Sequence, residues 1–170
     1  FAPHGLIVAE ANSSVTYVAR YMSASAGGEP MLHNGVLEVF VKPGARVRVA
    51  AVHELAEHVT DVNYRRAVVE NDGAVEWIVG ELSYGNGVAE TYSLLKGNGS
   101  QSDMKVISVG TGEQKLNYTT RAVHFGKASE SDMITKAVMC DQATAIVNGI
   151  TKIEHGATKA DGQQTEGVLM

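Results

Sequence analysis

Short β-strand signals recur along the whole chain at nearly even intervals, and no long helical stripe interrupts them. Glycine- and asparagine-rich segments such as Asn71–Gly73 and Gly97–Gly99 separate the apolar runs and mark turns. Evenly spaced short strands are typical of a sandwich, a barrel or a solenoid, so the pattern predicts an all-β fold. The spacing alone does not choose among these three. The predicted strand centres lie about 12 to 16 residues apart, at Tyr64, Trp77, Thr91, Val106, Tyr118, Ile134 and Ile146.

The clearest pair of predicted strands flanks a two-residue turn. Residues 37–41 and 45–49 are apolar or alternating, and in the second run valines alternate with arginines at the period of two that marks a half-buried strand. Between them, Pro43 presets φ and Gly44 accepts a positive φ, which indicates a turn. The best helix candidate in the chain is residues 52–58, and it is too short to be stable without packing.

Size and charge are those of an ordinary globular domain. A chain of 170 residues with 44% hydrophobic residues is long enough to bury a substantial core. The net charge of −5 and the lack of any Lys or Arg run argue against nucleic-acid and membrane partners. No segment approaches the roughly 20 apolar residues of a membrane span, and no signal peptide is recognisable. The single cysteine, Cys140, excludes an internal disulfide and fits a reducing cytoplasm.

One histidine-containing string looks like a zinc-protease motif but has the wrong spacing. In that motif the two histidines are four residues apart on one helix face. Here His53 and His58 are five residues apart, which places them roughly 140° apart around a helix at the usual step of about 100° per residue. We therefore expect a solvated turn or a short helix here rather than a metal site.

Three further residues have structural interpretations. One thiolate cannot hold an iron–sulfur cluster, which about four cysteinates normally bind, so Cys140 at a predicted strand end is expected to be structural or incidental. His124 shares a strand face with Ala122, and we interpret it as a hydrogen-bonded strand histidine. Trp77 lies among good β-formers and is expected in the core. The sequence contains no dinucleotide fingerprint, nucleophile elbow or phosphate loop.

The last third of the chain carries a family resemblance. It reads Asn-Tyr-Thr-Thr-Arg-Ala-Val-His-Phe-Gly over residues 117–126, Asn-Gly-Ile-Thr-Lys-Ile over 148–153 and Lys-Ala-Asp-Gly-Gln-Gln-Thr over 159–165. This succession resembles the SufB/SufD family, the scaffold proteins of the SUF system for iron–sulfur cluster assembly. It is most similar to the SufD branch. Shorter matches at residues 4–10 and 65–77 extend the resemblance over the whole chain.

The resemblance implies a right-handed parallel β-helix, in which two parallel sheets face each other and each coil adds one strand to each sheet. Two strand intervals, averaging about 27 residues, would then form one coil. Such coils are stabilised by stacking on their neighbours. The resemblance also implies one core domain over residues 1–170, incomplete at the C-terminus and at the N-terminus, without the terminal helical regions of the family.

The implied function is that of a non-catalytic scaffold subunit in the cytoplasm. Such a subunit pairs with SufB and acts with the ATPase SufC. Pairing with a second copy of itself is the alternative to pairing with SufB. The functional histidine of SufD lies several strands after the segment that residues 159–170 resemble, so we expect it beyond Met170. His155, beside Gly156, is then a turn histidine. We expect no catalytic, cofactor-binding or metal-binding residue in the chain, and the sequence beyond Met170 would separate SufD from SufB.

A β-helical carbohydrate-active enzyme, either a polysaccharide lyase or a hydrolase, is the alternative function. Such sites need clustered carboxylates along one sheet, often with calcium. The candidates are Asp103, Asp132 and Asp161, which we expect in turns. The sequence shows no pairing of carboxylates in successive coils, and the scaffold is therefore the preferred hypothesis.

Overall fold

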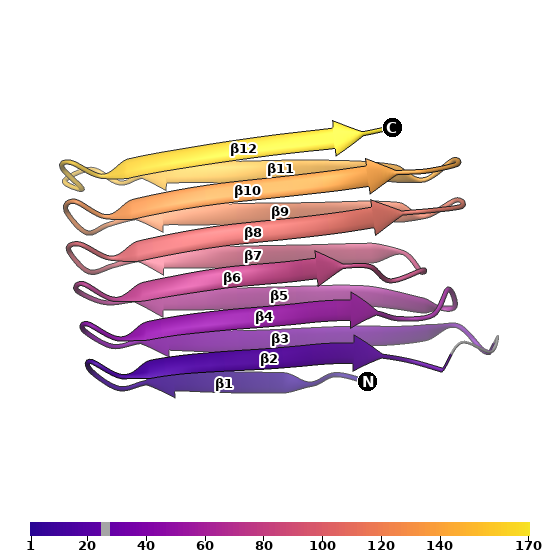
Figure 1. The fold of residues 1–170 in the computed structure, drawn as a ribbon, viewed down its shortest axis with the longest axis horizontal. Coiled ribbons are helices and arrows are strands. Elements are labelled where there is room, and N and C mark those ends of the chain that lie inside the picture. Colours follow the sequence, from indigo (N-terminus) through magenta and orange to yellow (C-terminus); the bar gives the residue numbers. More distant parts are fainter. Residues whose placement is uncertain (25–27) are drawn as a thin grey trace.

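Two parallel six-stranded sheets face each other and make a β-solenoid (Figure 1). The computed structural model describes residues 1–24 and 28–170. One sheet has the order β1-β3-β5-β7-β9-β11 and the other β12-β10-β8-β6-β4-β2, so the chain alternates between the sheets at every turn. The described residues contain only strands and their connections, with no helix long and apolar enough to span a membrane. The expected all-β parallel β-helix is confirmed.

The strands are regular and of similar length, and their bounds follow the predicted centres. They are β1 (His4–Ala9), β2 (Ser14–Met22), β3 (Met31–Val41), β4 (Arg46–Glu54), β5 (Val59–Val69), β6 (Ala74–Glu81), β7 (Gly87–Leu95), β8 (Gln101–Gly110), β9 (Lys115–His124), β10 (Glu130–Met139), β11 (Thr144–Ile153) and β12 (Asp161–Leu169).

The stacking repeat matches the predicted coil length of about 27 residues. Asn98 N donates to Asn71 Oδ1 over 2.8 Å, and these residues are 27 positions apart. One coil further on, Lys127 N donates to Asn98 Oδ1 over 2.8 Å, at a separation of 29 positions. The asparagines that looked like simple turn residues in the sequence therefore also bond one coil to the next.

Every turn that leads from an odd to an even strand has a left-handed residue two positions before the even strand begins, and the β11–β12 turn has a second one, Gly156. The predicted Pro43-Gly44 turn is among them, with Gly44 at a φ of 69°. Its N–H donates to Asn71 O in the next coil over 2.9 Å, and Asp72 N donates in the same way to Asn98 O over 2.9 Å. This corner therefore repeats one conformation from coil to coil. The left-handed residues at this position are Asn12, Gly44, Asp72, Gly99, Ala128 and Lys159.

The interior between the sheets is filled mainly by inward-facing β-branched residues and one tryptophan. Val41 and Val49 are fully buried, and so is Trp77, whose Nε1 donates to Ser93 Oγ over 3.1 Å. The prediction that Trp77 lies in the core is confirmed. Burial of these side chains supplies the main stabilisation, because each coil covers its apolar face only by stacking on another.

The helix candidate at residues 52–58 was wrong. Strand β4 continues to Glu54, and a turn at residues 57–58 leads into β5. The inward alternation of Val47 and Val49 continues through Ala51 to His53, which is only 1% exposed. The alternation of buried and exposed side chains in β4 thus extends into the segment that was expected to be helical. His53 is therefore an interior residue rather than part of a solvated turn.

Candidate functional site

A cluster of buried polar side chains interrupts the apolar interior at the corner where even strands lead into odd strands. Its members come from four consecutive strands, β3 to β6, and each is 1% to 4% exposed. Register explains how they meet, because His33 stacks directly on Asp61 in one sheet and His53 stacks on Glu81 in the other. The cluster consists of His33, His53, Asp61, Asn63, Arg65 and Glu81.

Asp61 stands at the centre of this cluster between two imidazoles. Its Oδ1 lies 2.7 Å from His33 Nδ1, and its Oδ2 lies 2.9 Å from His53 Nδ1. Asn63 Nδ2 also donates to Oδ1. Burial opposes ionisation of this carboxyl, but the hydrogen bonds and charges of His53 and His33 outweigh it and hold the pKa of Asp61 below its ordinary value. Asp61 is therefore a buried, ionised carboxylate.

Arg65 links the central carboxylate region to Glu81 across the two sheets. Its Nη1 lies 2.8 Å from Glu81 Oε1, and its Nη2 donates to His53 Nε2 over 2.7 Å. The nearby Tyr118 is 5% exposed, and burial together with the charges of Glu81 and Asp61 raises the pKa of its hydroxyl. The cluster thus combines two carboxylates, one guanidinium and two imidazoles in a closed space.

Tyr21 covers the cluster from the preceding coil. Its ring stacks on that of His53 with centroids 4.5 Å apart, and it lies 5.3 Å from the ring of His33. Burial and a hydrogen bond with Tyr17 raise the pKa of Tyr21 to about 12. The neutral phenol ring therefore packs against both imidazoles, and the ring of Phe1 also stacks on His33 at 5.7 Å.

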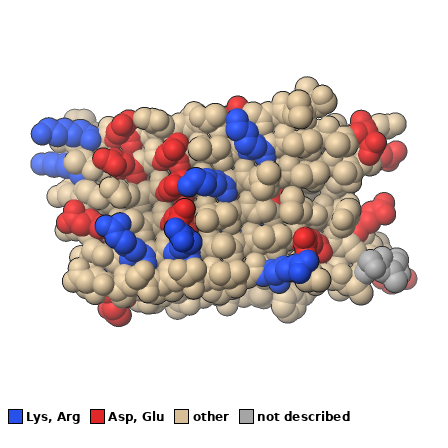
Figure 2. Space-filling view, viewed as in Figure 1, with Lys and Arg blue, Asp and Glu red and all other residues tan. Residues whose placement is uncertain are grey.

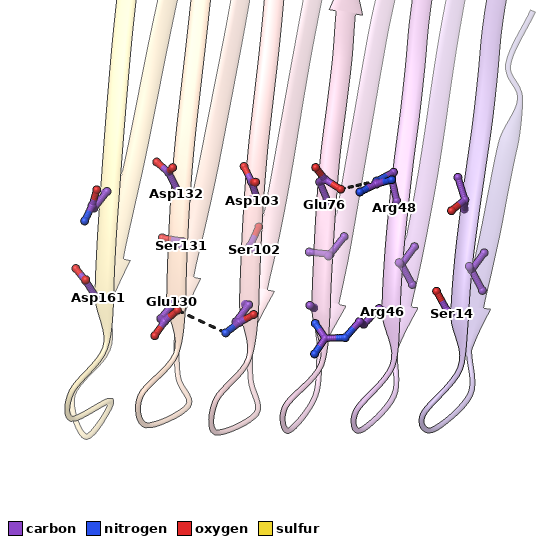
Figure 3. Close-up of a pocket in the computed structure, with 17 residues that line it drawn as sticks. Ser14, Arg46, Arg48, Glu76, Ser102, Asp103, Glu130, Ser131, Asp132 and Asp161 are labelled. Atoms are coloured by element: carbon purple, nitrogen blue, oxygen red, sulfur yellow. Dashed lines mark hydrogen bonds and ion pairs between the residues drawn. The ribbon is translucent and has the colours of Figure 1, made fainter.

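A second feature is a groove on the outer face of the even-strand sheet, near the strand starts (Figure 3). It has a volume of about 710 Å³ and crosses all six strands of this sheet. Its floor is built from two register rows, in which outward side chains of stacked strands lie side by side. One row is Ser14, Arg46, Ala74, Gln101, Glu130 and Asp161, and the other is Thr16, Arg48, Glu76, Asp103, Asp132 and Gln163.

Charge changes sign along this groove. Two arginines occupy β4, while the positions on the later strands are mostly acidic, and Figure 2 shows that most charged side chains on this face lie over the strand starts. Arg48 pairs with Glu76, and Lys105 Nζ lies 2.6 Å from Asp103 Oδ2. The hydrogen bond from Arg48 is the main cause that lowers the pKa of Glu76.

The expectation that the aspartates lie in turns was wrong. Asp103 and Asp132 are in the interior of β8 and β10 and are direct register partners, and Asp161 is the first residue of β12, paired with Glu130. Carboxylates in successive coils are therefore stacked, contrary to the sequence interpretation. The pairing was missed because the aspartates were expected in turns, and because the predicted coil of about 27 residues is shorter than the 29 positions that separate Asp103 from Asp132.

Three residues that the sequence analysis interpreted as structural, His124, Cys140 and His155, lie at separate places. His124 is fully buried in β9, with Nδ1 2.9 Å from Ser129 Oγ and Nε2 2.9 Å from Ser131 Oγ, so the hydrogen-bonded strand histidine is confirmed. Cys140 is an exposed free thiol directly after β10. His155 is exposed in the β11–β12 turn beside Gly156, whose φ is 96°, as expected.

The structure instead brings together His33, His53 and Asp61, of which only His53 drew attention in the sequence. The zinc-like motif paired His53 with His58, which lies in the turn at residues 57–58. The actual neighbours of His53 in this trio are His33 of β3 and Asp61 of β5. A usable signal existed in β5, where Asp61, Asn63 and Arg65 follow one another at the strand period of two.

Comparison with known proteins identifies the family. The family model for the SufBD core domain of SUF system iron–sulfur cluster assembly matches residues 1–170. The iron–sulfur cluster assembly protein SufD of Bacillus subtilis (strain 168) is 44% identical over 168 residues, which cover 98% of this chain and 38% of that protein. SufB of the same organism is 24% identical over 160 residues, covering 94% of this chain and 34% of that protein.

A SufBD family protein of Mycobacterium leprae (strain TN) is 29% identical over 154 residues, which cover 89% of this chain and 17% of that protein. The chain thus spans 17% to 38% of the length of these three relatives. The match of the family model over every residue, together with the parallel β-solenoid, leads to one conclusion. This chain belongs to the SufBD core-domain family.

Proposed function

We propose that this chain is the β-solenoid core of a SufD-like, non-catalytic scaffold subunit in iron–sulfur cluster assembly. The observation that carries the proposal is the difference in identity to two proteins of one organism, 44% to SufD against 24% to SufB. In this function the subunit pairs with a SufB-like protein, acts with a SufC-like ATPase and works in the cytoplasm. A second copy of the chain is the alternative partner.

The thiol content supports a scaffold rather than a cluster-holding protein. Cys140 is the only cysteine of the chain and is exposed directly after a strand, so it offers one thiolate where a cluster normally needs about four. A free thiol also fits the reducing compartment that we expect for the complex. We expect the purified chain to remain free of iron–sulfur charge-transfer absorption after incubation with iron and sulfide, and Cys140→Ser to behave in the same way.

A chimera tests the proposal directly. The matching stretch of the Bacillus subtilis SufD is replaced by this chain, and the hybrid is expressed in cells that lack their own SufD. We expect iron–sulfur enzyme activities to recover and the hybrid to co-purify with SufB and SufC. The matched control places the chain in the corresponding stretch of SufB, where the lower identity predicts no recovery.

Two outcomes contradict the SufD assignment. One is a SufD hybrid that accumulates normally, yet restores no activity and captures no SufB. The other is equal recovery from the SufB hybrid, which would assign the chain to SufB or to a core domain that serves either subunit.

A further inference from the structure

The buried cluster of His33, His53 and Asp61 has the composition of a metal site that no comparison assigns. We propose that these three residues bind one divalent first-row transition-metal ion, Fe²⁺ or Zn²⁺, inside the solenoid. The proposal goes beyond the scaffold function and does not rest on it. It departs from the expectation that the chain has no metal ligands, because the three residues become neighbours only through coil stacking.

The donor set and its spacing suit such an ion. Imidazole nitrogen with carboxylate oxygen is a common ligand combination for zinc, and two histidines with one carboxylate also hold non-haem Fe²⁺. The Nδ1 atoms of His33 and His53 face different oxygens of Asp61 at 2.7 and 2.9 Å. Atoms that share an ion at about 2.0–2.2 Å lie roughly 3 Å from each other. The donor atoms of the three residues all lie within 4.8 Å of one another, so the side chains must draw together to share one ion.

Two buried atoms of the cluster have few partners. His33 Nε2 is buried without a hydrogen-bond partner among the described residues, and the contact of Asp61 Oδ2 within the cluster is with His53 Nδ1 at 2.9 Å. Buried polar atoms with few partners are costly, and a cation bound at the cluster would add a partner for Oδ2.

The surrounding charges are compatible with a dication. Metal ligation requires both imidazoles in the neutral form, and the formal charges of Asp61, Glu81 and Arg65 then leave the cluster with one net negative charge. Binding through His53 Nδ1 moves the ring proton to Nε2, which now accepts from Arg65 Nη2 over 2.7 Å. Arg65 must then turn toward Glu81, whose Oε1 already lies 2.8 Å from its Nη1. Arg65 can thus give up its hydrogen bond to His53 and keep its ion pair with Glu81, which leaves His53 free to bind the ion.

Metal titration of the full chain tests the site. Chelator-treated protein is titrated with Zn²⁺, with Co²⁺ as a spectroscopic probe, and with Fe²⁺ without oxygen. We expect one ion per chain, visible d–d absorption of Co²⁺ at an N/O site, and a higher melting temperature with the ion. Asp61→Asn and His33→Gln should weaken binding at least tenfold. His155→Gln and Asp132→Asn, which change exposed residues elsewhere, should bind like the original chain.

Variants at the buried residues Asp61 and His33 can fail to fold, so a second measurement uses the unaltered chain. Imidazole nitrogen NMR should show Zn²⁺ shifting the resonances of His33 and His53 while those of His124 stay in place. The proposal is overturned if no stoichiometric ion binds, if the folded variants bind as well as the original, or if only the exposed His4 and His155 respond.

Discussion

Gly97 stands at the corner between β7 and β8, where one coil passes over the coil beneath it in contact with its backbone. A Cβ atom at this position would lie 2.0 Å from Asn71 N, and one at Gly126, in the next coil, would lie 1.8 Å from Gly97 O. These partners are backbone atoms, so no side chain can move aside. At the residue scale, the close approach of the coil backbones at this corner therefore requires glycine at these two positions.

We predict that Gly97→Ala lowers the free energy of unfolding by more than about 2 kcal/mol, because the backbone of two coils must separate. Gly80→Ala is the matched control, since a Cβ there meets only ordinary contacts at 3.6 Å or more. We expect its effect to stay within about 1 kcal/mol. Urea unfolding followed by circular dichroism measures both. Similar values for the two variants would contradict the close approach at Gly97.

His124 makes stability depend on pH. Burial lowers its pKa in the folded chain, whereas the unfolded chain titrates near the ordinary value of about 6.5. The unfolded state therefore binds the proton more readily, and this residue's contribution to stability is lost as the pH falls below about 6.5. We predict that His124→Gln is less stable than the original at about pH 8 and that the difference shrinks toward about pH 5.

Urea unfolding at several pH values measures this narrowing, with the exposed His155→Gln as control. The control should follow the original chain at every pH, because His155 makes no buried contacts to lose. A constant gap between the original and His124→Gln across the series would show that His124 titrates alike in the folded and unfolded chains.

At the scale of elements, the Arg65–Glu81 pair connects strands that belong to opposite sheets. Arg65 lies in β5 and Glu81 in β6, and their side chains are only 4% and 3% exposed. A buried pair of this kind contributes little net stability, but removing one partner leaves the other charge without compensation. The pair therefore constrains which side chains can fill this part of the interior.

We predict that Glu81→Gln destabilises the chain by about 3–5 kcal/mol, while the double variant Arg65→Met with Glu81→Leu recovers most of that loss. The reason is that the double variant leaves no unpaired buried charge behind. Thermal and chemical unfolding of the two variants and the original provide the comparison. A double variant as unstable as the single one would mean that Arg65 is needed for His53 as well as for Glu81.

Strand positions were predictable from the sequence, whereas the interior polar cluster was not. Alternation located β4 because its outward side chains include two arginines and its inward ones are valines. In β5 the same rule is ambiguous, because both faces mix polar and apolar residues: the inward face carries Asp61, Asn63 and Arg65 beside buried valines, and the outward face carries Tyr64 and Arg66. A period of two groups the three polar residues on one face but does not say which face is buried. Stacking across coils decides that.

For the molecule as a whole, charge is distributed unevenly along the stack. The arginines of β4 lie near one end of the outer groove, and carboxylates dominate the positions on the later strands (Figure 3). Stacked strands bring such residues about 4.8 Å apart, so like charges in one row repel each other. Asp103 and Asp132 form such a pair, and only Asp103 has an ion-pair partner, Lys105, among the contacts of the described residues.

We predict that Asp132→Asn stabilises the chain by about 0.2–1 kcal/mol at low ionic strength, because it removes this repulsion. The gain should shrink as salt is added, since exposed charges are screened. Asp103→Asn is the control and should bring no gain, because it also loses Lys105. Melting temperatures at low and high salt measure both. A gain for Asp132→Asn that is independent of salt would exclude repulsion as its cause.

The repeated left-handed corner has a consequence for how such a chain can change in length. The corner takes up small insertions, because residues 42–45 connect β3 to β4 whereas residues 154–160 connect β11 to β12, and the bond from a left-handed residue to the next coil is kept at both corners, from Gly44 N to Asn71 O and from Ala128 N to Thr158 O. A whole coil can be added as well, because every bond finds an equivalent partner. Gln101 pairs with Glu130, so a tandem copy of residues 101–129 inserted after Ser129 would reproduce each corner bond. The architecture therefore allows growth by duplication of complete coils, each adding about 4.8 Å to the stack.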